Sequence, residues 1–237
     1  LEFRRVLFRS VTLAYIPPTI AGVVLAYRKK YLLGGVITAL FIALQIQSNH
    51  IQMSYYFMFV ILFFIIAYFV DAYEKKELPH FFKASAILAL AAVVGVCVNI
   101  SNLYHTYEYS KETMRGKSEL KQEGPAANQT SSGLDRDYIT NWSYGIGETL
   151  TLLVPNVKGG GCSTTLSQNE TAMAKANPMY GNLYSQLTPY FGDQPWTAGP
   201  VYVGAFVVFL FILGCFIVKG PLKWALLGAT IFSILLS

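Results

Sequence analysis

Six apolar stretches, almost free of charged residues, constrain this chain more than any other feature. Each is long enough for a helix that crosses the ~30 Å hydrocarbon core of a bilayer, which takes about 17–25 residues. Their apolar residues are continuous rather than alternating, which excludes β-strands as the spanning elements. The stretches are residues 11–27, 31–47, 51–70, 84–103, 201–218 and 221–237. The sequence therefore predicts an all-α integral membrane protein, a polytopic bundle of about six transmembrane helices.

The charged residues set the expected orientation of these helices. Only 13% of the residues are charged, and the formal net charge is +5. Basic clusters at residues 28–30, 75–83 and 219–223 stand at the ends of apolar stretches, so they indicate topology rather than a nucleic-acid partner. When successive helices alternate in direction, all three clusters fall on one side. That side is predicted to be cytoplasmic, which places the long connection between the fourth and fifth helices outside.

The chain divides by composition into four parts. Residues 1–10, LEFRRVLFRS, match the translation of a common sequencing-adaptor oligonucleotide, so we set them aside as a read artefact. Residues 11–104 are expected to form four transmembrane helices, and residues 201–237 two more. Between them, residues 105–200 are predicted to form a large, partly ordered extracytoplasmic loop, because connections of this length are usually functional. The chain stops inside an apolar stretch, so we expect a C-terminally truncated piece of a longer parent protein.

Polar side chains crowd the outer end of the second helical hairpin, at residues 45–56 (QIQSNHIQMSYY). A polar group buried in lipid without a partner costs about 2–7 kcal/mol, so we expect these groups to face the bundle interior or a water-filled cleft. Such a cleft would bind a sugar or phosphate, with His50 able to exchange a proton. A wet helix turn with aromatic interface anchors is the alternative. The predicted substrate-binding residues are Asn49, His50, Gln52 and Tyr55.

The loop segment 133–156 holds the second polar group of interest. Aromatic rings stack on sugar faces and Arg binds phosphate through paired hydrogen bonds, so this mixture suits carbohydrate or lipid-phosphate binding. The predicted binding residues are Asp135, Arg136, Asp137, Trp142 and Glu148. An ordered surface loop is the alternative, in which Glu148 is a charge at a helix N-terminus.

Two short elements of the loop are expected to lie near the membrane. Residues 148–154 form an apolar run that is too short to span, and that is expected to lie on the membrane surface or pack under the loop. Trp196 and Tyr202 fit an aromatic belt where the fifth helix enters the membrane. Asp193, in the same segment, is interpreted as an exposed loop acid. The sequence has no metal-ligand spacing, and a divalent cation is kept only as a candidate cofactor.

Several separated motifs carry a family resemblance. They are NHIQMSYYF (49–57), YHTYEYSKETMRGKSEL (104–120), DYITNWSYGIGETLTLLVPNVKGG (137–160) and YFGDQPWTAGPVYVGA (190–205). Together they make residues 11–237 resemble the YfhO family of bacterial membrane proteins. That family is similar to the multi-spanning lipid-linked glycosyltransferases, with links to cell-surface polymers.

The resemblance implies an activity and its partners. It implies a multi-pass protein of the bacterial cytoplasmic (inner) membrane that takes a sugar from a polyprenyl-phosphate donor and transfers it to a cell-surface polymer on the outer face. In such enzymes a carboxylate of the first outer loop acts as general base on the acceptor hydroxyl. That loop would precede residue 11, so the catalytic residue is unknown and the chain alone is expected to be inactive.

Two other classes of function stay open at this point. A transporter or flippase for a lipid-linked or polar substrate would carry ionisable residues at mid-membrane depth and broken helices in matching halves. The stretches here hold almost no charge, which disfavours transport. A non-catalytic membrane scaffold, whose outer loop binds polymer or protein, is the third reading.

Overall fold

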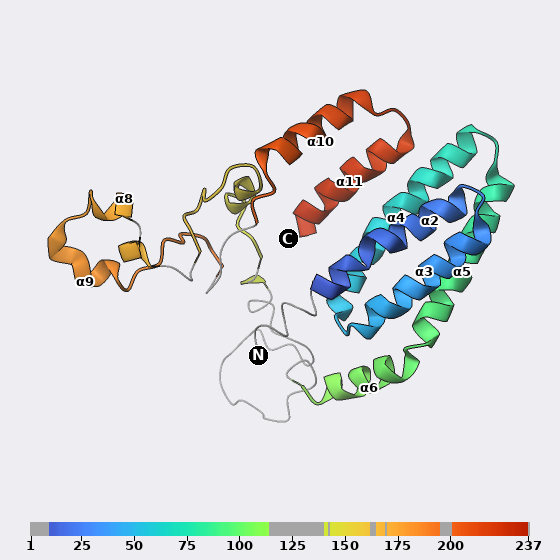
Figure 1. The fold of residues 1–237 in the computed structure, drawn as a ribbon, viewed down its shortest axis with the longest axis horizontal. Coiled ribbons are helices and arrows are strands. Elements are labelled where there is room, and N and C mark those ends of the chain that lie inside the picture. The colour runs from blue at the N-terminus through green and yellow to red at the C-terminus, as the bar shows by residue number, and fades with distance from the viewer. Residues whose placement is uncertain are drawn as a thin grey trace, which may run out of the picture. The chain divides into compact units, whose positions relative to one another are not determined.

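The computed structural model describes residues 10–113, 140–141, 143–161, 165–168, 170–194 and 201–236. Within these ranges the regular structure is helical and no β-strand occurs, which confirms the all-α prediction (Figure 1). The chain forms two compact units. The first holds the described residues up to Thr113 together with Val218–Ser233, and the second holds the described residues from 140 to Ile217 together with 234–236.

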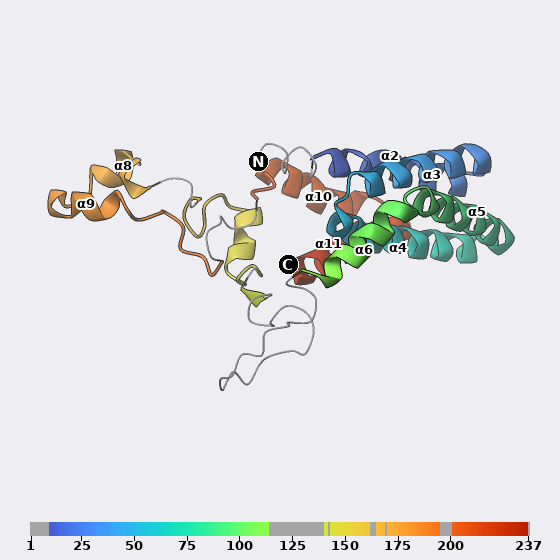
Figure 2. The same ribbon diagram turned by 90° about the horizontal axis from the view of Figure 1, so that it is seen from below.

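Four antiparallel helices form the body of the first unit. Their bounds are α2 Ile16–Tyr27, α3 Tyr31–Gln47, α4 Ile51–Glu74 and α5 Leu78–Cys97. The helix α3 contacts both α2 and α5, and α4 packs against α5, so the four lie side by side in both views of the ribbon (Figures 1 and 2). The helix α6, Ile100–Lys111, turns away from the end of α5, and α11, Pro221–Leu236, contributes Phe232 to a ring contact with Phe63 of α4.

Three helical segments are long and apolar enough to cross a membrane. They are Ser10–Tyr27, Ile51–Glu74 and Leu78–Cys97. The apolar helices α3, α10 (Ala205–Ile217) and α11 have fewer than eighteen residues. In the case of α10, the first four residues of the apolar stretch are not helical, and the last of these, Gly204, has a φ of 102°. The described structure therefore has three helical segments that could cross a membrane. The six crossings predicted from the sequence stay a prediction.

The fourth predicted span, residues 84–103, has the wrong bounds, because α5 runs from Leu78 to Cys97. Pro79 stands in the first turn of α5, where its missing N–H removes no helical hydrogen bond. Asn99 ends the helix at the other side, since its Nδ2 donates to the carbonyls of Ala43 (2.9 Å) and Gly95 (3.3 Å). The hydropathy of a stretch shows that it is apolar but does not show where the helix ends. The ends of a helix depend on residues such as Pro and Asn, which change its backbone hydrogen bonding.

Helices α2 and α3 approach each other through small residues. A Cβ added at Gly34 of α3 would lie 2.5 Å from the backbone nitrogen of Ala26 and 2.7 Å from the carbonyl oxygen of Gly22, both in α2. A Cβ at Gly22 would in turn meet the hydroxyl of Thr38 at 2.5 Å. Membrane helices associate by such close backbone packing, since lipid provides no hydrophobic drive to bring them together.

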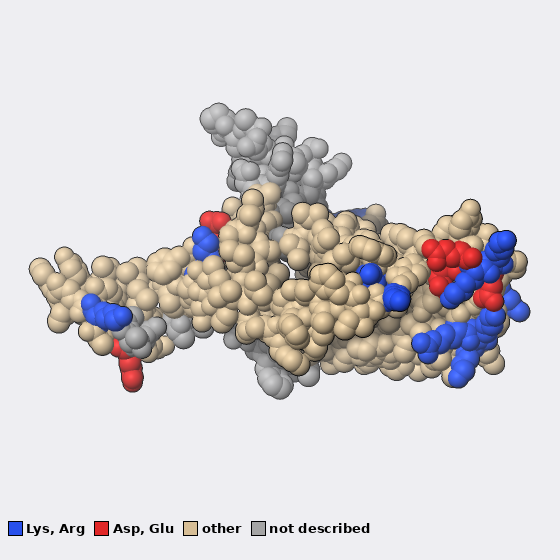
Figure 3. Space-filling model, turned by 90° about the horizontal axis from the view of Figure 1, so that it is seen from above, with Lys and Arg blue, Asp and Glu red and all other residues tan. Residues whose placement is uncertain are grey.

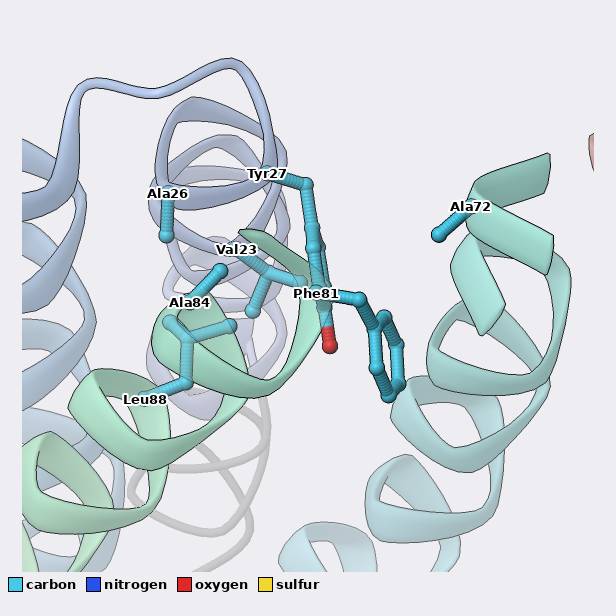
Figure 4. Close-up of a cluster of buried hydrophobic side chains, with 7 residues drawn as sticks. All are labelled: Val23, Ala26, Tyr27, Ala72, Phe81, Ala84 and Leu88. Carbon is cyan, nitrogen blue, oxygen red and sulfur yellow. The ribbon is translucent and has the colours of Figure 1, made fainter. Parts of the chain in front are cut away.

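Aromatic and small residues fill the core of this bundle. The ring of Tyr27 stacks on Tyr68 at a centroid distance of 4.3 Å. It also stacks on Phe81 at 5.6 Å (Figure 4). The Tyr27 hydroxyl is hydrogen-bonded to Ser85 at 2.9 Å, so its polar atom is satisfied inside the core. The buried cluster comprises Val23, Ala26, Tyr27, Ala72, Phe81, Ala84 and Leu88.

Charged side chains gather at one end of the bundle (Figure 3). The turn after α2 meets the turn after α4 in an ion pair of Lys29 and Glu77 at 3.1 Å. Lys75 donates to Asp71 at 2.7 Å, and this hydrogen bond raises the pKa of the Lys75 ammonium. Lys219 lines a hollow of about 170 Å³ together with Asp71. The three basic clusters of the sequence thus share one end of the unit.

The second unit consists of short helices and turns followed by α10. The 3-10 helix η1 spans Glu148–Leu152, and the pieces after it are η2 Leu166–Gln168, α8 Glu170–Met173, η3 Pro178–Tyr180 and α9 Gly181–Tyr184. Two backbone hydrogen bonds join the two ends of the segment 158–191, which we call the excursion. The Leu166 amide donates to Leu187 at 2.9 Å, and the Phe191 amide donates to Lys158 at 2.8 Å. The excursion therefore leaves and returns at neighbouring points.

Candidate functional site

The hairpin between α3 and α4 exposes most of the residues predicted to bind substrate there. Asn49 forms the turn with a φ of 57° and is exposed, as are Gln52 and Tyr55. His50 precedes the first turn of α4, and its Nδ1 is buried with no hydrogen-bond partner among the described residues. Their role in binding stays a prediction.

Two other polar residues of the same hairpin face the interior of the bundle. Gln45 is only 2% exposed and its Nε2 has no partner in the described part of the chain. The buried hydroxyl oxygen of Ser54 likewise has none there. Both side chains line a partly open cavity of about 370 Å³ formed by residues of α2, α3, α4 and α5. The expectation of inward-facing polar groups thus applies to Gln45 and Ser54.

In the second unit, the best-defined polar cluster is built around Glu148. Its side chain is fully buried, and Oε1 accepts hydrogen bonds from the Tyr190 hydroxyl at 2.8 Å and from the Asp193 amide at 2.6 Å. The amide of Gln194 donates to the Tyr190 oxygen at 3.3 Å, which extends the cluster by one member. The second carboxylate oxygen, Oε2, is buried with no partner in the described ranges. We call Glu148, Tyr190 and Asp193 the Glu148 cluster.

Glycines surround this carboxylate and explain why the chain can come so close to it. A Cβ at Gly192 would collide with Glu148 Oε1 and with the Tyr190 hydroxyl. A Cβ at Gly145 would collide with the Asp193 carboxylate, and one at Gly147 would lie 3.1 Å from Cε of Lys158. The backbone therefore passes close to the Glu148 cluster, and at Gly192 an added Cβ would displace the side chains of Glu148 and Tyr190.

The structure joins two sequence segments that the motif analysis treated separately. Glu148 was predicted to bind substrate, and it meets Tyr190 and Asp193 from a segment more than forty residues later in the chain. Asp193 is an exposed loop residue, as predicted, and its contact with Glu148 is made by its backbone amide. Nothing in the local sequence marks a partner so distant. The density of glycines around both segments was the available signal. Four predicted residues, Asp135, Arg136, Asp137 and Trp142, lie outside the described residues.

The cluster offers one kind of chemistry. Glu148 Oε1 is occupied by two donors, while Oε2 can accept a hydrogen bond from a hydroxyl, and a carboxylate acceptor forms roughly twice as strong a bond as a neutral one. No group of three or more His, Cys, Asp or Glu gathers anywhere in the described ranges in a way that could hold a metal ion. The acceptor Oε2, which has no partner in the described part of the chain, suits a ligand that carries a hydroxyl group.

No protein-family model, curated protein or solved structure matches this chain.

Proposed function

We propose that the chain is part of a membrane glycosyltransferase. In this proposal it transfers a sugar from a polyprenyl-phosphate donor to a cell-surface polymer, at the extracytoplasmic face of the bacterial cytoplasmic membrane. The resemblance to the YfhO family gives the class of reaction. Six crossings and the extracytoplasmic position of residues 105–200 belong to the same proposal, as do the lipid, donor and acceptor as partners.

The buried Glu148 carboxylate is the observation that carries this proposal. A charged group is costly to bury unless hydrogen bonds satisfy it, and here only one of the two oxygens is satisfied within the described chain. A sugar hydroxyl that donates to Oε2 would complete the set. Glu148 would then orient an acceptor or donor hydroxyl, and the general base that the resemblance implies would act from outside this chain.

The surroundings of Glu148 suit a reaction at a membrane surface. The Val203 amide donates to the Leu152 carbonyl at 3.2 Å, which ties η1 to the chain just before the apolar helix α10. Ile146 is 96% exposed and Leu150 is 57% exposed, so apolar side chains flank the buried carboxylate. Such exposed apolar residues favour the interface between water and lipid, where a polyprenyl phosphate presents its sugar.

The interior of the first unit disfavours transport of a charged substrate. No side chain that lines its central cavity carries a formal charge. Transporters place ionisable residues at this depth to bind ions and substrates.

Replacing Glu148 with glutamine tests the proposal in the full-length parent. The variant keeps the volume of the side chain but removes the charge, so transfer of a labelled lipid-linked sugar is expected to fall about 10- to 100-fold, the effect of losing one charge-assisted hydrogen bond. Glu108→Gln is the matched control, because Glu108 is exposed on α6 and pairs only with Lys111 in the described structure. Equal transfer by Glu148→Gln and Glu108→Gln would remove Glu148 from the site, and no transfer by the unaltered parent would reject the class.

Replacing His50 with alanine tests the outer hairpin separately. If His50 contributes its buried nitrogen to the substrate site, transfer is expected to fall several-fold, by about the effect of one hydrogen bond, with no loss of membrane insertion. The measurement is the same labelled-sugar assay, with insertion followed by resistance of the protein to carbonate extraction. Unchanged transfer would make the hairpin a structural turn.

A further inference from the structure

We infer that the cavity inside the first unit binds an uncharged, single-chain lipid, one whose polar head offers hydrogen-bond acceptors. The cavity measures about 370 Å³, within the range of ligand pockets in proteins, and lies among α2, α3, α4 and α5. This inference goes beyond the proposed transfer reaction, since it concerns a different site and a different ligand.

Unsatisfied polar atoms inside the cavity indicate a ligand with a polar part. Thr38 and Gln45 are each 2% exposed, yet Thr38 Oγ1 and Gln45 Nε2 have no hydrogen-bond partner among the described residues. Ser54 Oγ, which lines the same cavity, is in the same state. An unpaired buried polar group costs about 1–3 kcal/mol, so a ligand that bonds to Gln45 and Ser54 would remove two of these three costs. Gln45 Nε2 can only donate, and its partner must therefore supply an acceptor.

The shape and remaining lining of the cavity indicate an aliphatic chain. Its walls are formed mainly by apolar side chains, among them Ile42, Phe57, Met58, Ile61, Ile65 and Leu88. The lining residues of α4 run from Ser54 to Ile65, which corresponds to about 16 Å along a helix. Gln45 and Ser54 stand at the hairpin end of this length, and the apolar residues continue from there. A ligand with its head at the hairpin and its chain along α4 would match both parts.

Because the lining side chains carry no charge, the cavity favours a ligand with an uncharged head group. Every lining side chain is neutral, with hydroxyl and amide groups as its polar members. A phosphate or carboxylate in this position would lose its hydration without gaining a cation, which is unfavourable in a membrane interior. An ester or hydroxyl head, as in a monoacylglycerol, would accept from Gln45 and exchange hydrogen bonds with Ser54.

Binding of monoolein to the full chain in detergent micelles, followed by native mass spectrometry, tests this inference. We expect one monoolein per chain, and at least tenfold weaker binding of oleoyl lysophosphatidic acid, which has the same chain with a charged head. Ala92→Phe, which places a ring in the cavity, is expected to weaken monoolein binding at least tenfold. Ala86→Phe is the matched control, because Ala86 is exposed on the same helix and does not line the cavity.

A second variant keeps the test decisive if Ala92→Phe fails to fold. Gln45→Leu removes the donor while keeping an apolar side chain of similar size, so monoolein binding is expected to weaken about fivefold without loss of stability. Absence of a monoolein complex, equal binding of the charged lipid, or full binding by a folded Ala92→Phe protein would each overturn the inference. So would unchanged binding by Gln45→Leu.

Discussion

Replacing Gly34 with alanine is expected to lower the free energy of unfolding of the first unit by about 3 kcal/mol. The added Cβ would lie 2.5 Å from the backbone nitrogen of Ala26 and 2.9 Å from its Cα. These are backbone atoms of α2 that no rotamer change can move aside, so the two helices must separate. Titration of the protein from mild micelles with sodium dodecyl sulfate, followed by far-ultraviolet circular dichroism, measures the loss.

Gly214→Ala provides the matched control for this experiment. Gly214 also lies within an apolar helix, α10, but a Cβ added there meets no atom within 4 Å. Alanine has the higher helix propensity by about 1 kcal/mol, so this substitution is expected to be neutral or slightly stabilising. If Gly34→Ala and Gly214→Ala behaved alike, the close packing of α2 on α3 would be wrong.

The second large effect is expected for Gly159→Ala, which should lower the free energy of unfolding of the second unit by about 3 kcal/mol. Gly159 has a φ of 85°, a conformation that costs an alanine about 1 kcal/mol or more. Its new Cβ would also collide with the carbonyl oxygen of Pro189 and lie 2.7 Å from the carbonyl carbon. Hydrogen exchange of the amides from Phe191 to Gln194, measured by mass spectrometry, is expected to become faster, because the segments around Gly159 and Pro189 would move apart.

Gly181→Ala is the control in the same unit. Gly181 has a φ of −52°, which suits any residue, and a Cβ added there meets nothing within 4 Å. Exchange of the amides around Asp193 should then match that of the unaltered protein. Equal protection in Gly159→Ala would contradict the contact between Gly159 and Pro189 and, with it, the support that this contact gives to the Glu148 cluster.

Helix class and approximate position were predictable from hydropathy alone. Long apolar stretches predict helices because a chain in lipid must satisfy its backbone hydrogen bonds within one segment. The start and end of α5 were not predictable in this way. Its start depends on Pro79, and its end depends on Asn99 reaching the carbonyl of Ala43 in a different helix. The second of these is a tertiary contact that no local pattern records.

The Glu148 cluster was predictable only in part. Glu148 stood out as a carboxylate beside aromatic residues, but its hydrogen bonds to Tyr190 and Asp193 depend on the path of the chain between them. Likewise, Gln45 and Ser54 belonged to a recognisably polar hairpin, but the pattern did not show that they face inward while Gln52 is exposed. Side-chain direction at a helix end depends on the precise turn geometry, here the left-handed conformation of Asn49.

The hydrogen bond between Lys158 and Phe191, which joins the two ends of the excursion, has a consequence for the length of the chain between them. Since the Phe191 amide is anchored on Lys158, the chain between them begins and ends at one fixed point. We therefore expect that residues can be inserted or lost around α8 and α9 without altering the distance between Glu148 and Asp193. Changes of length in this segment would then leave the hydrogen bonds of the Glu148 cluster in place.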